Sequence, residues 1–496
     1  MKVMKNKLKK LLKDKVWRLN NLYKIKDKNG KIINLKLNQA QKYLFENYTY
    51  RNIILKARQL GFTTFIDVFF FDDCLFNKNI TTGIIAHNLE DANKIFKNKV
   101  KFVYENLPDE IKSVVKATTD RAGEMIFSNG SSISVSTSFR SGTLQRLHIS
   151  ELAKISLKYP QKAEEIMTGA VEAVSEDGII FIESTSEGSG GIFFDIYEKA
   201  NKISMQNRER HKLEYKDFFY PWYFDEKYKA DKSFYMDKFE EIDYKKYFNE
   251  LESKNIKLTI EQKAWYCLKC NALKEKMKQE YPTTPEEAFS AGISGTYYYD
   301  QFNYLRNNKK IGVNCYDKNL PVYTAWDLGY GDSTAIWFIQ FNRMDKENPY
   351  RAIDYYENSG EGIDHYLNIL KSKPYKYIKH IAPHDINNHV WSSTGGVTAW
   401  EKARQKGIYF EVAPKVSTID GINEVRKKLV SFLFDKKTEH GYNMLERYRK
   451  EWNDKTGKYK DKPFHDETSH CADAFRYFSV TVNKINKKQS DMIDMF

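Results

Sequence analysis

The sequence predicts an α/β protein built from two domains. Its 496 residues are more than one hydrophobic core usually serves. Short apolar segments alternate with helical stretches between residues 52 and 185, which indicates a parallel sheet covered by helices. From residue 322 a second series begins, in which three hairpin-linked strands, a helix and a further strand predict a separate α/β domain.

The composition is that of a folded protein with a basic surface. Apolar residues make up 41% of the chain and charged residues 29%. The formal charge of +14 and the pI near 9.1 favour a polyanionic partner, of which nucleic acid is the first candidate. We find no apolar run long enough to span a bilayer, no signal peptide and no disulfide framework, so we expect a cytoplasmic protein with no membrane segment.

The chain is expected to begin with a basic arm and a β-hairpin that turns at Asn29-Gly30. The predicted division of the chain is an arm and hairpin at 1–35, a first domain at 36–295 with a helical lid or connector at about 205–290, a linker at 296–318, a second domain at 319–485 and a C-terminal tail at 486–496.

A candidate phosphate loop follows the first strand of the first domain. The strand runs into K-A-R-Q-L-G-F-T-T and a helix begins at once, so that backbone N–H groups and the helix N-terminus point at one spot that suits an anion. The loop departs from G-x-x-x-x-G-K-[ST] at Lys56, in place of the first glycine, and at Phe62, in place of the lysine. The alternative is an ordinary strand–turn–helix with Gly61 as the turn residue.

Two later strands of the first domain end in polar residues. The strand at 147–150 ends in Ser150-Glu151, and a carboxylate beside a phosphate loop can orient and activate the attacking water. The strand GIIFI ends in Glu183-Ser184-Thr185 ahead of a glycine-rich loop. If the domain binds no nucleotide, the alternative for Ser150-Glu151 is the end of a strand that leaves the core. The alternative for Glu183-Ser184-Thr185 is a glycine-rich loop that leaves a strand.

Three aspartates occur at the elements of the second domain that could form one site. Asp327 lies in its first strand between apolar residues, where an uncompensated carboxylate is costly. Asp385 ends the strand KHIAPHD, and Asp473 lies on a helix whose apolar residues pack inward. Carboxylates so placed would hold two divalent ions across a scissile phosphate, although each alone is more often a turn or capping residue. Asp332 and Asp466 are second candidates for ligands, and Asp332 has the alternative of stabilising a hairpin turn.

Taken in this order over nearly the whole chain, these motifs resemble the large subunit of viral DNA-packaging terminases. K-A-R-Q-L-G-F-T-T is similar to the deviant phosphate loop of that family, in which the basic residue moves to the start of the loop. The segment at 147–151 resembles its Walker B motif, with Ser150 where the family has an aspartate. The resemblance implies a RecA-like P-loop ATPase domain followed by an RNase H-like nuclease domain.

The resemblance also implies a role for each candidate residue. In the ATPase these are Lys56 and Arg58 for phosphate contacts, Gly61 in the loop, Thr63 with Thr64 as the alternative for Mg²⁺, Gln41 for adenine, Glu151 as the catalytic carboxylate that activates water, and Ser184 and Thr185 for coupling. In the nuclease they are Asp327, Asp385 and Asp473 as catalytic metal ligands.

A protein of this family would use ATP with Mg²⁺ in the ATPase and Mg²⁺ or Mn²⁺ in the nuclease. It would drive double-stranded viral DNA into a procapsid and then cut it, as a ring of copies on the portal protein and together with a small terminase subunit. We expect it in the host cytoplasm, transiently at the procapsid portal, and not in the mature virion. Two alternatives remain: an ATP-dependent recombination or repair nuclease, and a non-catalytic DNA-binding packaging scaffold.

Overall fold

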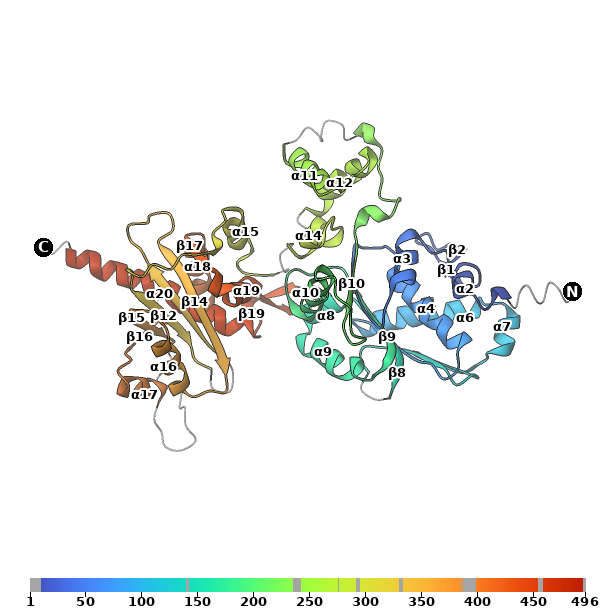
Figure 1. Ribbon diagram of the computed structural model, residues 1–496, viewed down its shortest axis with the longest axis horizontal. Coiled ribbons are helices and arrows are strands. Elements are labelled where there is room, and N and C mark those ends of the chain that lie inside the picture. Colours follow the sequence, from blue (N-terminus) through green and yellow to red (C-terminus); the bar gives the residue numbers. More distant parts are fainter. Residues whose placement is uncertain are drawn as a thin grey trace. The chain divides into compact units, whose positions relative to one another are not determined.

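The computed structural model of the chain forms two compact units, Met1–Gly292 and Ile293–Phe496, each with its own sheet (Figure 1). It describes residues 10–139, 142–234, 242–274, 276–290, 295–329, 333–384, 386, 398–453 and 458–493. Within these ranges, no helix is long and apolar enough to cross a membrane.

The first unit contains an eight-stranded sheet in the order β10-β3-β9-β8-β4-β7-β6-β5. The strands are β3 (Arg51–Lys56), β4 (Thr81–Ile85), β5 (Ala117–Arg121), β6 (Glu124–Phe127), β7 (Ser132–Ser136), β8 (Leu144–Ser150), β9 (Val174–Ser184) and β10 (Lys216–Tyr220). All pairs from β10 to β7 are parallel, and only the β5–β6–β7 end is antiparallel. Numbered along the chain, the strands from β10 to β4 have the order 5-1-4-3-2, which is the arrangement of a RecA-like P-loop ATPase.

Helices cover both faces of this sheet. They are α3 (Gln39–Asn47), α4 (Phe62–Phe76), α5 (Leu89–Ile95), η1 (Phe96–Lys101), α6 (Phe102–Glu105), α7 (Asp109–Val114), α8 (Leu152–Lys158), α9 (Pro160–Glu165), η2 (Ile166–Val171) and α10 (Gly191–Met205). Successive residues of β3 belong to different cores, since Ile54 packs with α3 and α4 while Ile53 and Leu55 pack with α8 and α10. The sheet is therefore buried on both faces, as the continuous apolar strands predict.

The segment expected to form a helical lid differs from the prediction in one respect. It contains the short helices η3 (Trp222–Phe224) and η4 (Lys232–Phe234) and the helices α11 (Ile242–Ser253), α12 (Ile260–Leu273), α13 (Lys276–Glu280) and α14 (Pro285–Ser290). It also contains β10, which pairs in parallel with β3 at the edge of the core sheet. The prediction of a helical segment misses this strand, because K-D-F-F-Y has only two buried residues and charged neighbours hide its pattern.

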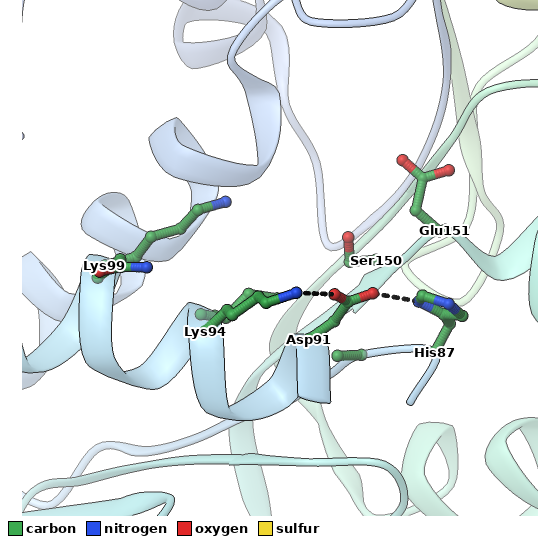
Figure 2. Close-up of a pocket in the computed structure, with 9 residues that line it drawn as sticks. His87, Asp91, Lys94, Lys99, Ser150 and Glu151 are labelled. Carbon is green, nitrogen blue, oxygen red and sulfur yellow. Dashed lines mark ion pairs between the residues drawn. The ribbon is translucent and has the colours of Figure 1, made fainter. Parts of the chain in front are cut away.

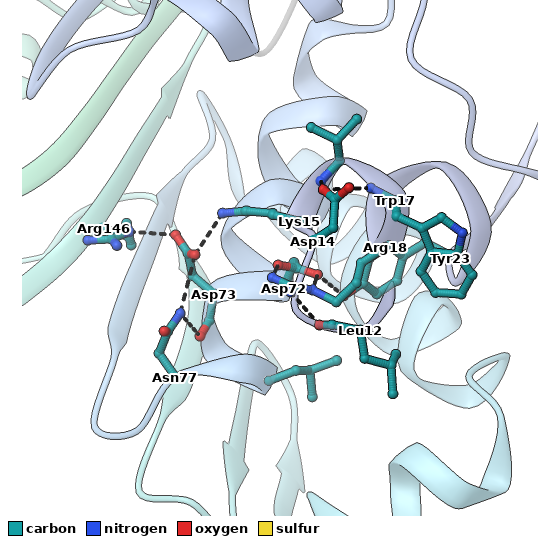
Figure 3. A network of polar contacts seen from close by, with 12 residues as sticks. Leu12, Asp14, Lys15, Trp17, Arg18, Tyr23, Asp72, Asp73, Asn77 and Arg146 are labelled. Atoms are coloured by element: carbon teal, nitrogen blue, oxygen red, sulfur yellow. Dashed lines mark hydrogen bonds and ion pairs between the residues drawn. The ribbon is translucent and has the colours of Figure 1, made fainter. Parts of the chain in front are cut away.

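The N-terminal region contains α2 (Lys15–Asn21) and the predicted hairpin of β1 (Lys24–Lys26) and β2 (Ile32–Asn34). The helix α2 is held against α4 by polar contacts, as Figure 3 shows. Arg18 donates to both oxygens of Asp72 at 2.8 and 2.7 Å, and Lys15 lies 2.7 Å from Asp73. The described part of the basic arm is therefore fixed to the helix that follows the phosphate loop.

The second unit contains a seven-stranded sheet in the order β11-β17-β14-β13-β12-β15-β16. The strands are β11 (Ile311–Val313), β12 (Val322–Asp327), β13 (Ser333–Phe341), β14 (Tyr350–Ser359), β15 (Tyr377–Ala382), β16 (Phe410–Val412) and β17 (Phe432–Asp435). The strands β12, β13 and β14 are antiparallel neighbours, whereas β15 is parallel to β12 and β16 to β15. Counted from β12, the order 3-2-1-4-5 is that of an RNase H-like fold.

Two cores lie on opposite faces of this second sheet. The helices are α15 (Tyr299–Asn307), α16 (Ile363–Ser372), α17 (Ala399–Gln405), α18 (Thr418–Leu429), η7 (Lys436–Thr438), α19 (Glu439–Arg447) and α20 (Thr468–Ile493), and β18 (Lys450–Asn453) pairs with β19 (Lys458–Pro463). Trp337 and Ile339 pack with α18 and α20, while Ile336 and Phe338 pack with α16.

Both predicted ends of the second domain are extended by the structure. The segment 296–318, expected to be a linker, contains α15 and β11, because Phe302 and Leu305 bury one face of the helix in the core. The segment 486–496, expected to be a tail, continues α20 as far as Ile493.

Candidate functional site

The phosphate loop joins β3 to α4 through two residues with left-handed backbone. Gln59 has φ 63° and Gly61 has φ 77°, and a Cβ on Gly61 would lie 3.0 Å from the Gln41 amide nitrogen. Lid residues hold the loop from outside, since Tyr228 Oη donates to the Arg58 carbonyl at 2.7 Å and Arg58 N donates to the Glu280 carbonyl at 2.8 Å. Contacts within the chain therefore hold the loop in this shape.

Lys56 lies at the start of this loop as a buried cation. Its side chain is 7% exposed, and Nζ lies 3.1 Å from Glu151 Oε1 and 3.0 Å from Glu183 Oε2. Burial disfavours the charged form, but the two carboxylates outweigh burial and raise the pKa of Lys56 above its ordinary value. Lys56 thus carries a fixed positive charge at the carboxyl edge of the sheet.

The other predicted cation is placed differently. The Arg58 side chain is 57% exposed and pairs with Glu280 at 3.1 Å. An exposed pair of this kind is weak, with a typical contribution of about 0–1 kcal/mol, so it holds the Arg58 side chain only loosely.

Glu151 follows β8 in a left-handed conformation, with φ 60° and ψ 44°. A non-glycine residue held there costs about 1–3 kcal/mol, and such residues cluster at functional sites. Its carboxylate accepts from Ser184 Oγ at 3.3 Å and from Thr185 N and Oγ1 at 3.4 Å. The structure therefore joins the predicted catalytic acid directly to the two predicted coupling residues.

A pocket of about 240 Å³ opens beside Glu151 (Figure 2). It is lined by Ala86, His87, Asp91, Lys94, Ile95, Asn98, Lys99, Ser150 and Glu151. His87 Nδ1 lies 2.8 Å from Asp91 Oδ2, and burial with the charge of Lys154 lowers the pKa of His87. The pocket therefore lies beside Glu151 at the carboxyl ends of β4 and β8, while the Glu151 carboxylate itself contacts Lys56, Ser184 and Thr185.

Gln41 lies against the phosphate loop and is 5% exposed. Its amide completes a capping box with Asn38 at the start of α3, and Nε2 donates to the Gly61 carbonyl at 3.0 Å. In this structure the predicted adenine-reading residue stabilises the loop.

Glu183 is the residue that the sequence reasoning left without a role of its own. It is fully buried at the end of β9, and Oε1 accepts from Thr63 Oγ1 at 2.7 Å and from Ser150 Oγ at 2.8 Å. Despite burial, Lys56 and His148 hold the pKa of Glu183 below its ordinary range. The signal in the sequence was a charged residue that directly follows the apolar run GIIFI. The alternative hydroxyl, Thr64, lies half-buried at the next position of α4.

The buried pair of His148 and Asp67 lies beside Glu183. His148 Nδ1 lies 2.7 Å from Asp67 Oδ1, and His148 Nε2 lies 3.6 Å from Glu183 Oε1, with all three side chains fully buried. Burial opposes the charge on the imidazole, but the two carboxylates raise the pKa of His148 to about 9. A charged imidazole therefore stands between α4 and β9.

The second unit places Asp327 and Asp473 on neighbouring elements. Asp327 ends β12, its side chain is 16% exposed, and Oδ2 lies 2.8 Å from His470 Nδ1. Burial raises the pKa of Asp327 to about 6; the nearby Asp473 adds to this shift and His470 opposes it. Asp473 follows His470 by one turn of α20 and pairs with Arg476 at 2.9 Å.

The remaining predicted ligands fall into two groups. Asp385 and Asp332 lie outside the described residues, although the strand that precedes Asp385 does lie parallel beside β12, as expected. The Asp466 side chain is 6% exposed, accepts from Thr468 N at 3.0 Å and pairs with Arg449 at 3.1 Å. These contacts give Asp466 a structural role at the start of α20.

Glu357 is a carboxylate near this site that the sequence reasoning missed. It lies on β14 in one cross-strand row with Asp327, because Asp327 pairs with Ala335 and Ala335 pairs with Glu357. His440 Nε2 lies 3.4 Å from its Oε2. Only the strand register reveals the row, and a single sequence does not contain that register.

The described residues contain no group of three or more histidine, cysteine or acidic side chains close enough to hold a metal ion. Asp327 and Asp473 nevertheless fit a divalent cation, because two neighbouring, partly buried carboxylates gain from an added positive charge.

We compared the chain with known proteins, and no protein-family model and no curated protein sequence matches it. Solved structures do match. The HK97 bacteriophage large terminase is 10% identical over 95% of this chain and 99% of its own, with a TM-score of 0.46. A large terminase from a thermophilic bacteriophage is 14% identical over 90% of this chain and 99% of its own, with a TM-score of 0.31. The P22 large terminase nuclease domain is 17% identical over 35% of this chain and 89% of its own, with a TM-score of 0.27.

Proposed function

We propose that this chain is a viral terminase large subunit, an ATP-driven DNA translocase joined to a metal-dependent endonuclease. One observation carries the proposal. Lys56 contacts Glu151 and Glu183 at the carboxyl edge of a RecA-like sheet, and Thr63 donates to Glu183, in the same chain as an RNase H-like sheet that bears the partly buried Asp327. An ATPase followed by a nuclease of these two folds is the combination that the sequence motifs predict for this family.

In the ATPase, each side chain has a task that its contacts support. Lys56 and Arg58 bind the phosphates, and Gln41 and Gly61 hold the loop in shape. Glu151 takes the proton of the attacking water as general base. When bound with ATP, Mg²⁺ screens the phosphate charges.

Glu151 also connects hydrolysis to motion. Because Ser184 and Thr185 both donate to its carboxylate, a change in the charge or position of Glu151 alters the bonds of the loop that leaves β9. That loop precedes α10, so a change in the nucleotide state moves this helix through the loop.

In the nuclease, Asp327, Asp473 and Asp385 bind divalent ions, with Asp332 and Asp466 as weaker candidates. Mg²⁺ or Mn²⁺ suits a set of oxygen ligands and supplies a metal-activated water when bound. His470 orients Asp327 through the 2.8 Å contact and keeps its carboxylate directed at the site.

The proposed partners follow from the function. Double-stranded DNA suits the charge of +14, since phosphate contacts need lysine and arginine. A portal protein, a small terminase subunit and further copies of this chain in a ring complete the packaging motor, which would work in the host cytoplasm at the procapsid.

The test is plasmid cleavage with and without Mn²⁺, run beside an ATPase assay on one preparation of the full chain. We expect metal-dependent cutting together with ATP hydrolysis that duplex DNA stimulates. A chain that binds DNA but lacks both activities would be a packaging scaffold, and selective cutting at DNA junctions would favour a recombination nuclease.

A further inference from the structure

The proposed ATPase lacks one residue that a phosphate-loop enzyme needs. In P-loop ATPases the Mg²⁺ of the nucleotide is held by the loop hydroxyl and by an aspartate that precedes the catalytic acid. Here the residue before Glu151 is Ser150, whose neutral hydroxyl is a weak ligand for a hard dication. A carboxylate must come from elsewhere or the ion is held poorly.

The strand beside Ser150 carries such a carboxylate. Ser150 on β8 and Glu183 on β9 are paired in register, and the two strands are parallel neighbours. Since β9 lies between β8 and the phosphate-loop strand β3, a side chain at its end is placed between the loop and the Walker B position. The serine at 150 is small, and its hydroxyl donates to Glu183 at 2.8 Å.

The contacts of Glu183 are those that the missing aspartate would make. Oε1 accepts from the hydroxyl of Thr63, the residue predicted to hold Mg²⁺, at 2.7 Å. Oε2 lies 3.0 Å from Lys56, the cation predicted to contact the phosphates. Glu183 is fully buried, and His148 beside it is fixed by Asp67.

We propose that Glu183 replaces the missing Walker B aspartate and supplies, from the adjacent strand, the carboxylate that holds the Mg²⁺ of bound ATP. The inference rests on the proposed ATPase. It makes the pair of Ser150 and Glu183 one functional unit, in which the shorter residue at 150 gives space to the longer acid at 183. A purely structural Glu183, serving only as counter-ion of Lys56 and His148, would leave the Mg²⁺ dependence of nucleotide binding unchanged.

The test measures binding and not turnover, with a fluorescent N-methylanthraniloyl derivative of ATPγS titrated in excess Mg²⁺ and in EDTA. The wild-type chain should bind this probe more tightly with Mg²⁺. In Glu183→Gln, the ratio of the affinity in Mg²⁺ to the affinity in EDTA should be about 10- to 100-fold smaller than in the wild type, which is the usual cost of removing a group that supports a metal site. In EDTA its affinity should equal or exceed wild type, because a negative charge near the phosphates is gone.

Two further variants sharpen the result. Ser150→Asp combined with Glu183→Gln returns a carboxylate to the Walker B strand and should restore the Mg²⁺ gain. Glu176→Gln removes an exposed acid from the opposite end of β9 and should behave as wild type. Thermal melting of each variant shows whether it is folded, and if Glu183→Gln alone does not fold, the double variant decides by itself.

The outcomes separate the two proposals. An undiminished Mg²⁺ gain in folded Glu183→Gln, or no recovery in the double variant, would overturn the role of Glu183 and leave the ATPase assignment standing. A wild-type chain that does not bind the probe under either condition would overturn the ATPase assignment, and the role of Glu183 with it.

Discussion

The docking of the N-terminal helix onto α4 allows a stability prediction with a magnitude. Arg18 is 6% exposed, and the Asp72 side chain that it contacts is fully buried. In the polar network of Figure 3, Arg18→Ala leaves Asp72 with the hydroxyl of Tyr23 as its remaining contact. The substitution also removes the guanidinium that lies 4.1 Å from the centre of the Phe76 ring. Removing one partner of a buried ion pair typically costs about 3–5 kcal/mol, because the remaining charge stays buried without compensation.

The expected shift in melting temperature follows from the size of the unit. In a domain of 150–250 residues, a loss of 1 kcal/mol in the free energy of unfolding lowers the melting temperature by roughly 2–4 °C. The first unit, which ends at residue 292, is larger, so we expect a shift of about 2 °C or less for each kcal/mol. Differential scanning calorimetry should therefore show one transition lowered by about 6–10 °C, while the transition of the second unit stays in place.

Two controls test the reasoning behind that magnitude. Arg121→Ala removes an arginine whose side chain is 70% exposed and should change stability by at most about 0.5 kcal/mol. Arg18→Met combined with Asp72→Leu removes both charges and should recover most of the loss. A loss below about 1 kcal/mol in Arg18→Ala would refute the argument, because the buried carboxylate would then be tolerated without its partner.

Three further predictions concern the ATPase and DNA binding. Lys56→Ala should weaken nucleotide binding, measured by titration with a fluorescent ATP analogue, because it removes the buried cation from the phosphate loop; unchanged affinity would exclude Lys56 as a phosphate contact. Burial, with the charges of Glu151 and Glu280, raises the pKa of Glu187 to about 7, so the neutral carboxyl stabilises the fold below about pH 4 and this contribution is lost as the pH rises through about 7. Melting curves should show Glu187→Gln gaining stability over wild type between about pH 4.5 and 7.5, and a constant difference across that range would contradict the shift. Duplex DNA affinity should fall steeply with salt and vary little with sequence, and salt-independent binding in a filter or fluorescence assay would argue against phosphate contacts.

The class of fold was predictable because its signals are local. Continuous apolar strands alternating with helices mark a buried parallel sheet, and the Asn-Gly pair that favours a hairpin turn at residues 29 and 30 does lie between the paired strands β1 and β2. The order of the first three strands and the helix of the second unit was also visible in the sequence. The fold class that these patterns predict is confirmed by the two sheets.

The elements that were missed carry weak local signals. The strand β10 is five residues long beside charged neighbours, and β11 is three residues long. Both lie at sheet edges, where pairing with a stronger neighbour provides most of the stability. Tertiary pairing, which the sequence pattern does not contain, decided these segments.

The site residues also divide into those that local sequence locates and those that depend on strand pairing. The strand ends that hold Lys56, Glu151 and Asp327 could be located because each directly follows or belongs to an apolar run. The importance of Glu183 and Glu357 depends on which strands are neighbours and in what register, since each meets its partners only across a sheet.

The most direct test of the account separates its two activities by mutation. Glu151→Gln and Asp327→Asn are each assayed for ATP turnover and for plasmid cutting on the same preparation, with Asp300→Asn, an exposed acid of α15, as the matched control. Glu151→Gln should bind ATP but lose about 10²–10⁴-fold in hydrolysis, because an amide cannot accept the proton. Asp327→Asn should abolish cutting and hydrolyse ATP normally, since asparagine keeps the shape but not the charge that binds metal. Normal hydrolysis by Glu151→Gln, or undiminished cutting by Asp327→Asn, would contradict the account of one chain with an ATPase and a nuclease.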